Sequence, residues 1–335
     1  MTSSQVELNR ELEIPKFPEK LEGSFWGMTT FFNPAGYGNK AVNYRKFRES
    51  LRRQGLKLVC VELAFNDKPF ELKNDDAEIL IQVRSNSIMW QKERLLNIAF
   101  KNLPPDCDKV AWIDCDIIFN NDDWIKEAAE LLERFIIVQL FSFIAYLPRE
   151  GKILDFYNIQ FKERSGQAFF YFGMAYAFAM AGNFLFDSYL GNDFPGRAGG
   201  AWACRRDVLE KCGFFDACIF GSNDGIMAYA ICGVDKFSTF DFFSKPLTLE
   251  QSTWHKEASE LFKGSCFYVD GILTHLWHGE LDKREYAIRE EIGRKYNFDP
   301  STDLKLNEGG CFEWASDKKE MHKSLQEYFL SRQEE

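Results

Sequence analysis

The chain has 335 residues, enough for one large domain or two ordinary ones, and its 45% hydrophobic content, with 33 Phe, allows a full buried core. Its formal net charge of −10 argues against a nucleic-acid partner, because binding a phosphate backbone requires clustered Lys and Arg. Nine irregularly spaced Cys, several of them inside apolar runs, and a polar and charged beginning predict a cytoplasmic protein with reduced thiols.

The first part of the chain alternates between short apolar runs and amphipathic segments. Residues 1–23 are polar and charged, and we expect a poorly ordered arm there. The pattern then alternates between strands and helices, which predicts an α/β layered fold with a largely parallel sheet. The predicted strands cover residues 24–32, 56–63, 77–83, 110–113 and 136–141, and the predicted helices cover residues 39–54, 87–103 and 124–135.

The second part is less regular, and it contains a loop at 191–200 with four glycines and a proline. No linker divides the chain, so we predict one domain. The elements expected here are a strand and a helix start within 201–212, a turn at 213–216, a helix at 224–232, a strand at 267–273, and surface helices at 282–296 and 317–332.

Residues 165–186 carry no charge over 22 residues, a length that could span a bilayer. The segment also contains Gln167, Asn183 and three glycines. It lies between two blocks that we expect to form one site, and a spanning helix would separate them. We therefore predict a buried or cleft-lining segment, with membrane contact through 165–186 as the alternative.

The sequence Asp114-Cys115-Asp116 directly follows a buried strand, and apolar residues resume at once after it. Two carboxylates this close together repel each other unless they are solvated, capped or bridged by a cation. A strand-end turn is the alternative. Because ligands of α/β proteins bind at the carboxyl ends of strands, we expect a divalent metal here that holds a diphosphate. A dehalogenase-type phosphotransferase also uses Asp-x-Asp, but we rank it lower because residue 118 is Ile rather than Thr or Val.

The helix before this strand offers polar groups that could face the same ligand. Lys92 and Asn97 are about 140° apart around a helix and could flank one ligand. Arg84, just past the third strand, could meet a phosphate, although a solvated side chain is the alternative for it. Glu93 is interpreted as an ordinary solvated charge.

Two later stretches carry further candidates. Gly200, at the end of Gly199-Gly200, would let another molecule approach the backbone, and Trp202 offers either a platform for a sugar face or ordinary core packing. Asp224, in Gly221-Ser222-Asn223-Asp224-Gly225, suits a general base or a helix cap.

Two of the four histidines follow the predicted strand at 267–273. A histidine after a strand can join carboxylates as a metal ligand. We favour this role for His278, and a satisfied, partly buried imidazole for His275.

Taken together, these blocks resemble a metal-dependent glycosyltransferase of the GT-A type, and most specifically the β-galactosyltransferase family that builds lactosamine. That family has Leu-Leu-Asn before an Asp-x-Asp strand, then Gly-Gly, Gly-Phe, Glu-Asp and a histidine. This chain has the same order over about residues 78–285, in Leu95-Leu96-Asn97, Asp114-Cys115-Asp116, Gly199-Gly200, Gly213-Phe214, Asn223-Asp224 and His278. It departs from the family in having Asn223 in place of the glutamate, in lacking the family's membrane anchor, and in the segment 165–186, which has no counterpart.

The resemblance implies a Rossmann-like α/β/α sandwich that transfers a sugar from a UDP- or GDP-sugar to the hydroxyl of a glycan or glycoconjugate acceptor, with inversion. It implies a nucleotide-sugar-binding half (24–140), an acceptor-binding and catalytic half (141–300) and a C-terminal helical extension (301–335). Asp116, His278 and Asp114 would bind Mn²⁺ or Mg²⁺, and Asp224 would be the catalytic base. Asp114, Lys92, Asn97 and Arg84 would contact the donor, and Gly200, Trp202, Asn223 and His275 the acceptor or sugar. A sugar nucleotidyltransferase and a non-catalytic carbohydrate-binding protein are the alternatives.

Overall fold

In the computed structural model, residues 20–149, 169–181, 196–233, 243–279, 286–332 and 334 are described. Most of the predicted arm, part of the loop at 191–200 and the start of the predicted helix at 282–296 lie outside these ranges.

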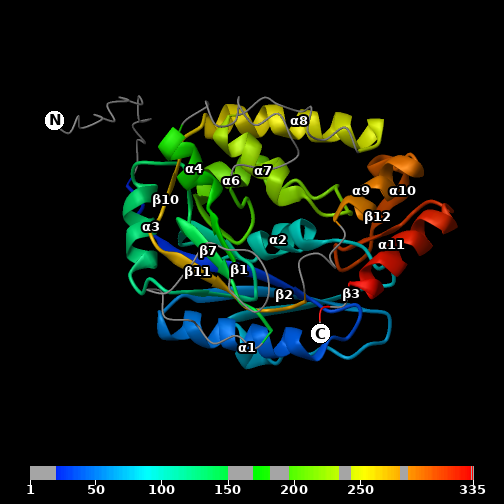
Figure 1. The fold of residues 1–335 in the computed structure, drawn as a ribbon, viewed down its shortest axis with the longest axis horizontal. Helices are drawn as coiled ribbons and strands as arrows, with labels where there is room; N and C mark the ends of the chain where they lie inside the picture. The colour runs from blue at the N-terminus through cyan, green and yellow to red at the C-terminus, as the bar shows by residue number, and fades with distance from the viewer. Residues whose placement is uncertain are drawn as a thin grey trace.

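A large sheet forms the middle of the described structure. Its strands are β1 (Ser24–Phe32), β2 (Lys57–Phe65), β3 (Ile79–Ser85), β4 (Cys107–Ile113), β6 (Ile137–Gln139), β9 (Ala201–Arg205) and β10 (Cys266–Tyr268). They are ordered β10-β6-β9-β4-β1-β2-β3, and within this sheet only β9 runs against the others (Figure 1). The predicted α/β fold with a mostly parallel central sheet is confirmed.

A second, smaller sheet lies against one face of the first. It is ordered β5-β11-β7-β8, from β5 (Ile117–Phe119), β11 (Ile272–His275), β7 (Phe143–Tyr146) and β8 (Phe169–Phe172). The single strand predicted at 267–273 is in fact two strands, because the chain turns at Gly271 (φ +143°) between β10 in the large sheet and β11 in the small one. This change of sheet carries His275 to β5.

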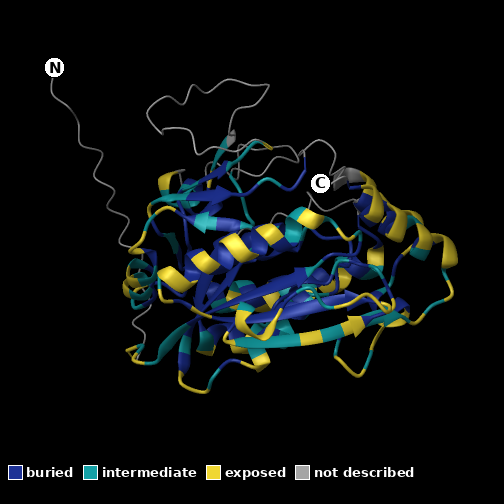
Figure 2. Ribbon diagram, turned by 90° about the horizontal axis from the view of Figure 1, so that it is seen from below, coloured by how far each residue is buried: buried dark blue, intermediate teal, exposed yellow. Residues whose placement is uncertain are grey.

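Helices pack on both faces of the large sheet. On one face lie α1 (Gly38–Arg53) and α3 (Trp124–Leu132), whose apolar side chains share a core with the small sheet. On the other face lie α2 (Lys92–Lys101), α4 (Met174–Ala181) and α6 (Arg206–Cys212), with α7 (Asn223–Cys232) and α8 (Lys245–Phe262) farther out (Figure 1). Buried residues fill the strands, and exposed residues follow the outer sides of the helices (Figure 2).

The 18-residue helix α8 was not predicted from the sequence. Its buried residues recur at helical spacing, but two of them, Gln251 and His255, are polar and interrupt the apolar pattern. Only burial against α6 and α7 distinguishes this face from a solvated one.

The segment beyond residue 300 packs against the rest of the chain. It contains α10 (Pro300–Asp303), the hairpin β12 (Leu304–Leu306) and β13 (Phe312–Trp314), and α11 (Lys319–Ser331), which contacts α9 (Tyr286–Lys295). Met321 and Leu325 of α11 are fully buried, and the ring of Phe329 stacks on Trp90 at 6.4 Å. The division at residue 300 stays a prediction.

Within the uncharged segment, residues 169–181 form β8 and α4, and Met174 and Ala175 of α4 are fully buried. None of the helices in the described ranges combines the length and the apolar character that crossing a membrane requires.

Candidate functional site

A cavity of about 720 Å³ opens where β1 and β4 end, at the carboxyl edge of the large sheet. Its walls hold candidate metal ligands, further carboxylates and cations that come from distant parts of the sequence. The charged residues and histidines among them are Lys40, Lys92, Asp114, Asp116, Arg197, Asp224, His275, His278, Arg289, Arg332 and Glu334.

The ladder between β5 and β11 brings Asp116 to the two histidines. Asp116 immediately precedes β5, and His275 pairs with Ile117 across the antiparallel ladder. The backbone N–H of Leu276 also donates to the Asp116 carbonyl at 2.8 Å. In this arrangement Nε2 of His278 lies 3.1 Å from Oδ2 of Asp116, and Nε2 of His275 lies 3.7 Å from Oδ1.

Asp116, His275 and His278 form a group that fits a divalent transition metal. One ligand atom from each lies within 4.8 Å of the others. Nδ1 of His275 is 2.9 Å from the carbonyl of Leu276, so a proton on Nδ1 leaves the Nε2 lone pair facing Asp116. Two imidazoles and one carboxylate suit Mn²⁺ and related ions. His275, predicted to bind acceptor or sugar, is instead placed among the candidate metal ligands.

Asp114 lies apart from this group and faces Lys92 and Asp224. Nζ of Lys92 is 2.6 Å from Oδ1 of Asp114 and 3.0 Å from Oδ1 of Asp224. Burial lowers the pKa of Lys92, but the two carboxylates outweigh burial and hold that pKa well above its ordinary value. Burial raises the pKa of Asp114, and Lys92 opposes this effect. Lys92 therefore stays charged and bridges the strand end to the start of α7.

Glycines allow the two sides of the cavity to approach each other. A Cβ at Gly199 would lie 3.0 Å from Oδ2 of Asp224, and Gly200 has φ +106°. The carbonyl of Gly200 accepts from the Asp114 backbone N–H at 2.8 Å. The small-residue pair thus makes room for the carboxylates, and Gly200 lines the cavity as predicted.

Four predicted ligand-binding residues do not line the cavity: Asn97, Arg84, Trp202 and Asn223. Asn97 faces the turn after α6, where its amide exchanges hydrogen bonds with the Phe214 backbone. Arg84 donates to the carbonyls of Asn66 and Lys68 beside the Phe70 ring. These two side chains are engaged in hydrogen bonds to other parts of the protein, so we do not retain them as residues that bind the nucleotide-sugar donor.

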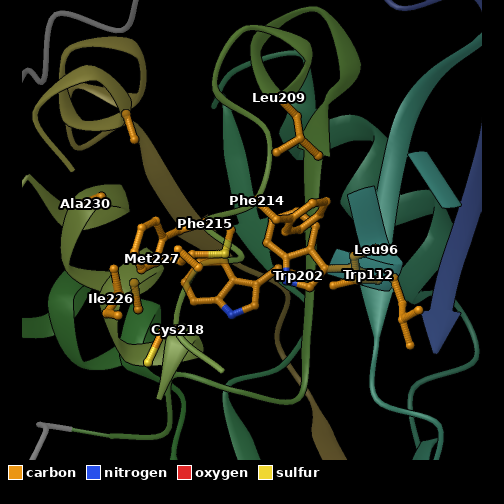
Figure 3. Packing of buried hydrophobic residues seen from close by; sticks show 14 of the residues in the cluster. Leu96, Trp112, Trp202, Leu209, Phe214, Phe215, Cys218, Ile226, Met227 and Ala230 are labelled. Carbon is orange, nitrogen blue, oxygen red and sulfur yellow. The ribbon is translucent and has the colours of Figure 1, made fainter. Parts of the chain in front are cut away.

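Trp202 is the third of these, and it belongs to the core. Successive side chains of a strand point to opposite faces, and Trp202 of β9 points to the face that α6 and α7 cover. It lies beside Trp112 and Phe214 (Figure 3), is 3% exposed, and donates from Nε1 to the Ala198 carbonyl. Trp202 is not retained as a sugar platform.

Glu93, interpreted from the sequence as solvated, is 3% exposed. Its Oε2 accepts from Nδ2 of Asn223 at 2.7 Å and from Nε1 of Trp90 at 3.0 Å. Burial raises the pKa of Glu93 to about 7, against the opposing effect of Lys92. The Asn223 side chain, predicted to bind the acceptor or sugar, is therefore buried against Glu93 and does not line the cavity.

Sequence reasoning missed several residues of the cavity. Lys40 follows Gly36 and Gly38, a pattern that is only weakly similar to a phosphate-binding loop. Arg289 lies on a helix that was predicted to be a surface element, yet it is 5% exposed. Nothing in the local pattern marks Arg197, Arg332 or Glu334, because only the packing of their segments brings them to the cavity.

No family model matches the chain, and no curated protein matches it. Several solved structures are similar in fold. Glucosyl-3-phosphoglycerate synthase from Mycobacterium tuberculosis, in complex with Mn²⁺, UDP and phosphoglyceric acid, is 13% identical over 80% of this chain and 75% of that chain, with a TM-score of 0.40. TarS 1–349 from S. aureus, in complex with UDP-GlcNAc, is 9% identical over 92% and 72%, also with a TM-score of 0.40.

Two more distant enzymes are matched as well. The catalytic domain of Drosophila β1,4-galactosyltransferase 7, in complex with xylobiose, is 13% identical over 61% of this chain and 59% of that chain, with a TM-score of 0.30. A 4-diphosphocytidyl-2C-methyl-D-erythritol synthase from Anaerococcus prevotii is 13% identical over 74% and 87%, with a TM-score of 0.36. Against the longer TarS structure, the match spans 33% of that chain. These likenesses are too distant to carry over a function, and they do not confirm the more specific resemblance to β-galactosyltransferases.

Proposed function

We propose that the protein transfers a sugar from a nucleoside diphosphate sugar to the hydroxyl of a glycan or glycoconjugate acceptor. One observation carries this proposal: a single cavity holds a set of candidate metal ligands and a separate carboxylate, Asp224, which pairs with Lys92. Group transfer from a diphosphate needs both a charge-stabilising centre for the leaving group and a base for the incoming hydroxyl.

The proposed metal ligands are Asp116, His275 and His278. A divalent ion bound there would act as a Lewis acid and stabilise the negative charge on the departing diphosphate. Lys92 offsets part of the negative charge of Asp114 and Asp224, so that donor phosphates can approach this acidic wall. Asp114 lines the same cavity, paired with Lys92, and can face the donor there.

Asp224 is the proposed general base. It lies in the first turn of α7, and its side chain is 36% exposed, so an acceptor hydroxyl can reach it. The acceptor oxygen attacks the anomeric carbon, its proton passes to the Asp224 carboxylate, and the bond from the anomeric carbon to the diphosphate oxygen breaks. Attack from the face opposite the leaving group inverts the anomeric configuration.

A panel of UDP- and GDP-sugars, each with and without Mn²⁺, tests this proposal. We expect one donor to bind only with metal and to be hydrolysed slowly to free sugar and nucleoside diphosphate when no acceptor is present. Calorimetry measures the binding, and product analysis measures the hydrolysis. Glycan binding without metal or nucleotide, and without turnover, would instead identify a carbohydrate-binding protein.

A sugar nucleotidyltransferase is the second candidate. It is favoured by the position of Lys40, which follows two glycines after β1 and lines the same cavity. In the structure Nζ of Lys40 is 2.9 Å from Oε2 of Glu334, so an ion pair already engages it. Release of pyrophosphate from a nucleoside triphosphate and a sugar phosphate would identify this reaction.

A further inference from the structure

Glu334, beyond the last helix, lies inside the candidate site. Glu334 is 2% exposed and is one of the residues that line the cavity. The first turn of α1 holds it there: Nδ2 of Asn39 donates to the Glu334 carbonyl, and Nζ of Lys40 is 2.9 Å from Oε2. Arg332 adds a third contact, to Oε1. Two elements far apart in the sequence thus fix one buried carboxylate beside the histidines.

The two nitrogens of the His278 ring face different carboxylates, Asp116 and Glu334. Nε2 of His278 is directed at Asp116, at 3.1 Å from Oδ2, and Nδ1 lies 3.7 Å from Oε1 of Glu334. His275 has a parallel arrangement, since its Nε2 faces Asp116 and its Nδ1 lies 2.9 Å from the Leu276 carbonyl. Each imidazole therefore has an oxygen acceptor behind it.

Oε1 of Glu334 is suited to accept a hydrogen bond from His278. It is buried and has no hydrogen-bond partner among the described residues, although the Arg332 guanidinium contacts it. The ion pair with Arg332 offsets the cost of burying this oxygen, and an imidazole N–H directed at it would add a hydrogen bond. The ammonium of Lys40 and the guanidinium of Arg332 both pair with this carboxylate. The group is thus an ionised acceptor.

We propose that Glu334 is a positioning residue for the metal site: its carboxylate accepts from Nδ1–H of His278 and directs the Nε2 lone pair toward the metal. The proposal rests on the metal site of the proposed function. A carboxylate behind a ligating imidazole fixes its tautomer and ring orientation and makes it a more basic ligand. The segment after α11 thereby becomes part of the metal site.

Mn²⁺ affinity in the absence of donor is the first test, measured by calorimetry or by the electron paramagnetic resonance of free Mn²⁺. Loss of such a partner weakens metal binding by about 10–100-fold, which we expect for Glu334→Ala. Glu334→Gln keeps the volume and an acceptor oxygen, so it should restore part of the affinity. Glu327→Gln, at an exposed position on α11, is the matched control and should leave affinity unchanged.

The tautomer of His278 is the second test, and it needs neither metal nor donor. The chain has four histidines, so ¹⁵N-histidine labelling resolves each ring in a long-range nitrogen–proton spectrum. At a pH where the rings are neutral, we expect His278 to carry its proton on Nδ1 in the wild-type protein and to lose this preference in Glu334→Ala.

Two outcomes would overturn the proposal. One is wild-type or tighter Mn²⁺ affinity in a folded Glu334→Ala protein; tighter binding would mean that Glu334 obstructs the site. The other is an unchanged His278 tautomer. Asp116→Ala separates these from failure of the metal site itself: if it also keeps full Mn²⁺ affinity, the proposed function fails, whereas if it alone loses affinity, only the role of Glu334 is wrong.

Discussion

At the scale of single residues, the two carboxylates of Asp114-Cys115-Asp116 face different partners. Asp116 faces His275 and His278, whereas Asp114 faces Lys92. On an extended strand, side chains two residues apart would share one face, but the chain turns at Cys115 and Asp116, and this turn separates the two carboxylates. The same motif thus contributes to a candidate metal group on one side and to an ion-pair network on the other.

Replacing Asp116 tests the metal group. We expect Asp116→Ala to abolish Mn²⁺-dependent nucleotide binding, because it removes the only carboxylate of the three-residue group. Mg²⁺ should support weaker binding than Mn²⁺ in the wild-type protein, since two of the three candidate ligands are imidazoles and Mg²⁺ prefers oxygen. Calorimetry with each ion measures both effects. Asp67→Ala, at an exposed position, is the control, and unchanged nucleotide binding by Asp116→Ala would rule out the assignment.

Replacing Asp224 tests the general base. Asp224→Asn should lower the rate of sugar transfer by about 10²–10⁴-fold, because the amide cannot take the acceptor proton. Donor affinity with Mn²⁺ should stay near the wild-type value. Initial rates and calorimetry measure the two quantities, with Asp207→Asn, an exposed residue in the first turn of α6, as the control. Transfer at the wild-type rate would show that another group is the base.

The buried carboxyl of Glu93 predicts a pH dependence of stability. Its pKa is raised from 4.5 to about 7, chiefly by burial, so its contribution to stability is fully present below pH 4.5 and is lost as the pH rises through 7. Relative to Glu93→Gln, the wild-type protein should therefore lose free energy of unfolding between pH 5 and pH 8, on the order of 1–3 kcal/mol. Urea unfolding at both pH values measures this. The free energy of unfolding of Glu327→Gln should change with pH as that of the wild-type protein does. The prediction would be contradicted if Glu93→Gln showed the same pH dependence as the wild-type protein.

At the scale of elements, helix α2 directs polar side chains to three different places. Lys92 reaches the cavity, Glu93 is buried against Asn223, and Asn97 bonds to the turn after α6. The sequence showed that the helix precedes the Asp-x-Asp strand and predicted that the helix lies beside the site. It did not show which face of the helix meets the cavity, because α6 and α7 cover the other faces.

The hydrogen bonds of the Asn97 side chain predict that this residue stabilises the fold. Its side chain makes hydrogen bonds to N–H and C=O of Phe214 and to the Asp216 carboxylate. Asn97→Ala leaves these groups without their partner and should lower the free energy of unfolding by about 1–3 kcal/mol. Donor affinity should not change, because Asn97 lies away from the cavity. Asn102→Ala, an exposed residue at the end of α2, should cost less than about 0.5 kcal/mol. A loss of donor affinity without a loss of stability would return Asn97 to the donor site.

At the scale of the whole molecule, the last part of the chain joins the core and the cavity together. The buried face of α11 packs on the core beside Trp90, and Arg332 and Glu334 beyond it line the cavity. A segment predicted as an extension thus supplies both apolar contacts and charged groups of the site.

Truncating one core residue of α11 tests how closely this segment is coupled to the rest. Leu325 is fully buried, so Leu325→Ala should lower the free energy of unfolding by about 2–5 kcal/mol in a single cooperative transition. Circular dichroism and fluorescence during urea unfolding should give the same midpoint. Leu330→Ala, at a position that is 45% exposed, is the control and should have a small effect. Two separate transitions for the Leu325 variant would support an independent extension after residue 300.

Local periodicity in the sequence was sufficient to predict the α/β class, the mostly parallel sheet, and the order of most helices and strands. Apolar spacing decides which face of an element can be buried, and this information lies within one segment. The prediction failed where polar residues sit in a buried face, as Gln251 and His255 do in α8, and where Gly271 divides a run between two sheets.

The sequence also singled out Lys92, Asp114, Asp116, Asp224, His275 and His278, all of which line the cavity. Only the tertiary structure decided how they are grouped: His275 joins Asp116 because β11 inserts between β5 and β7, and Trp202 is excluded because its side of β9 faces α6 and α7. Contacts between residues more than a hundred positions apart depend on strand order, register and the packing of whole elements, and no local pattern encodes these. For the same reason, Glu334 could be connected to His278 only in the folded molecule.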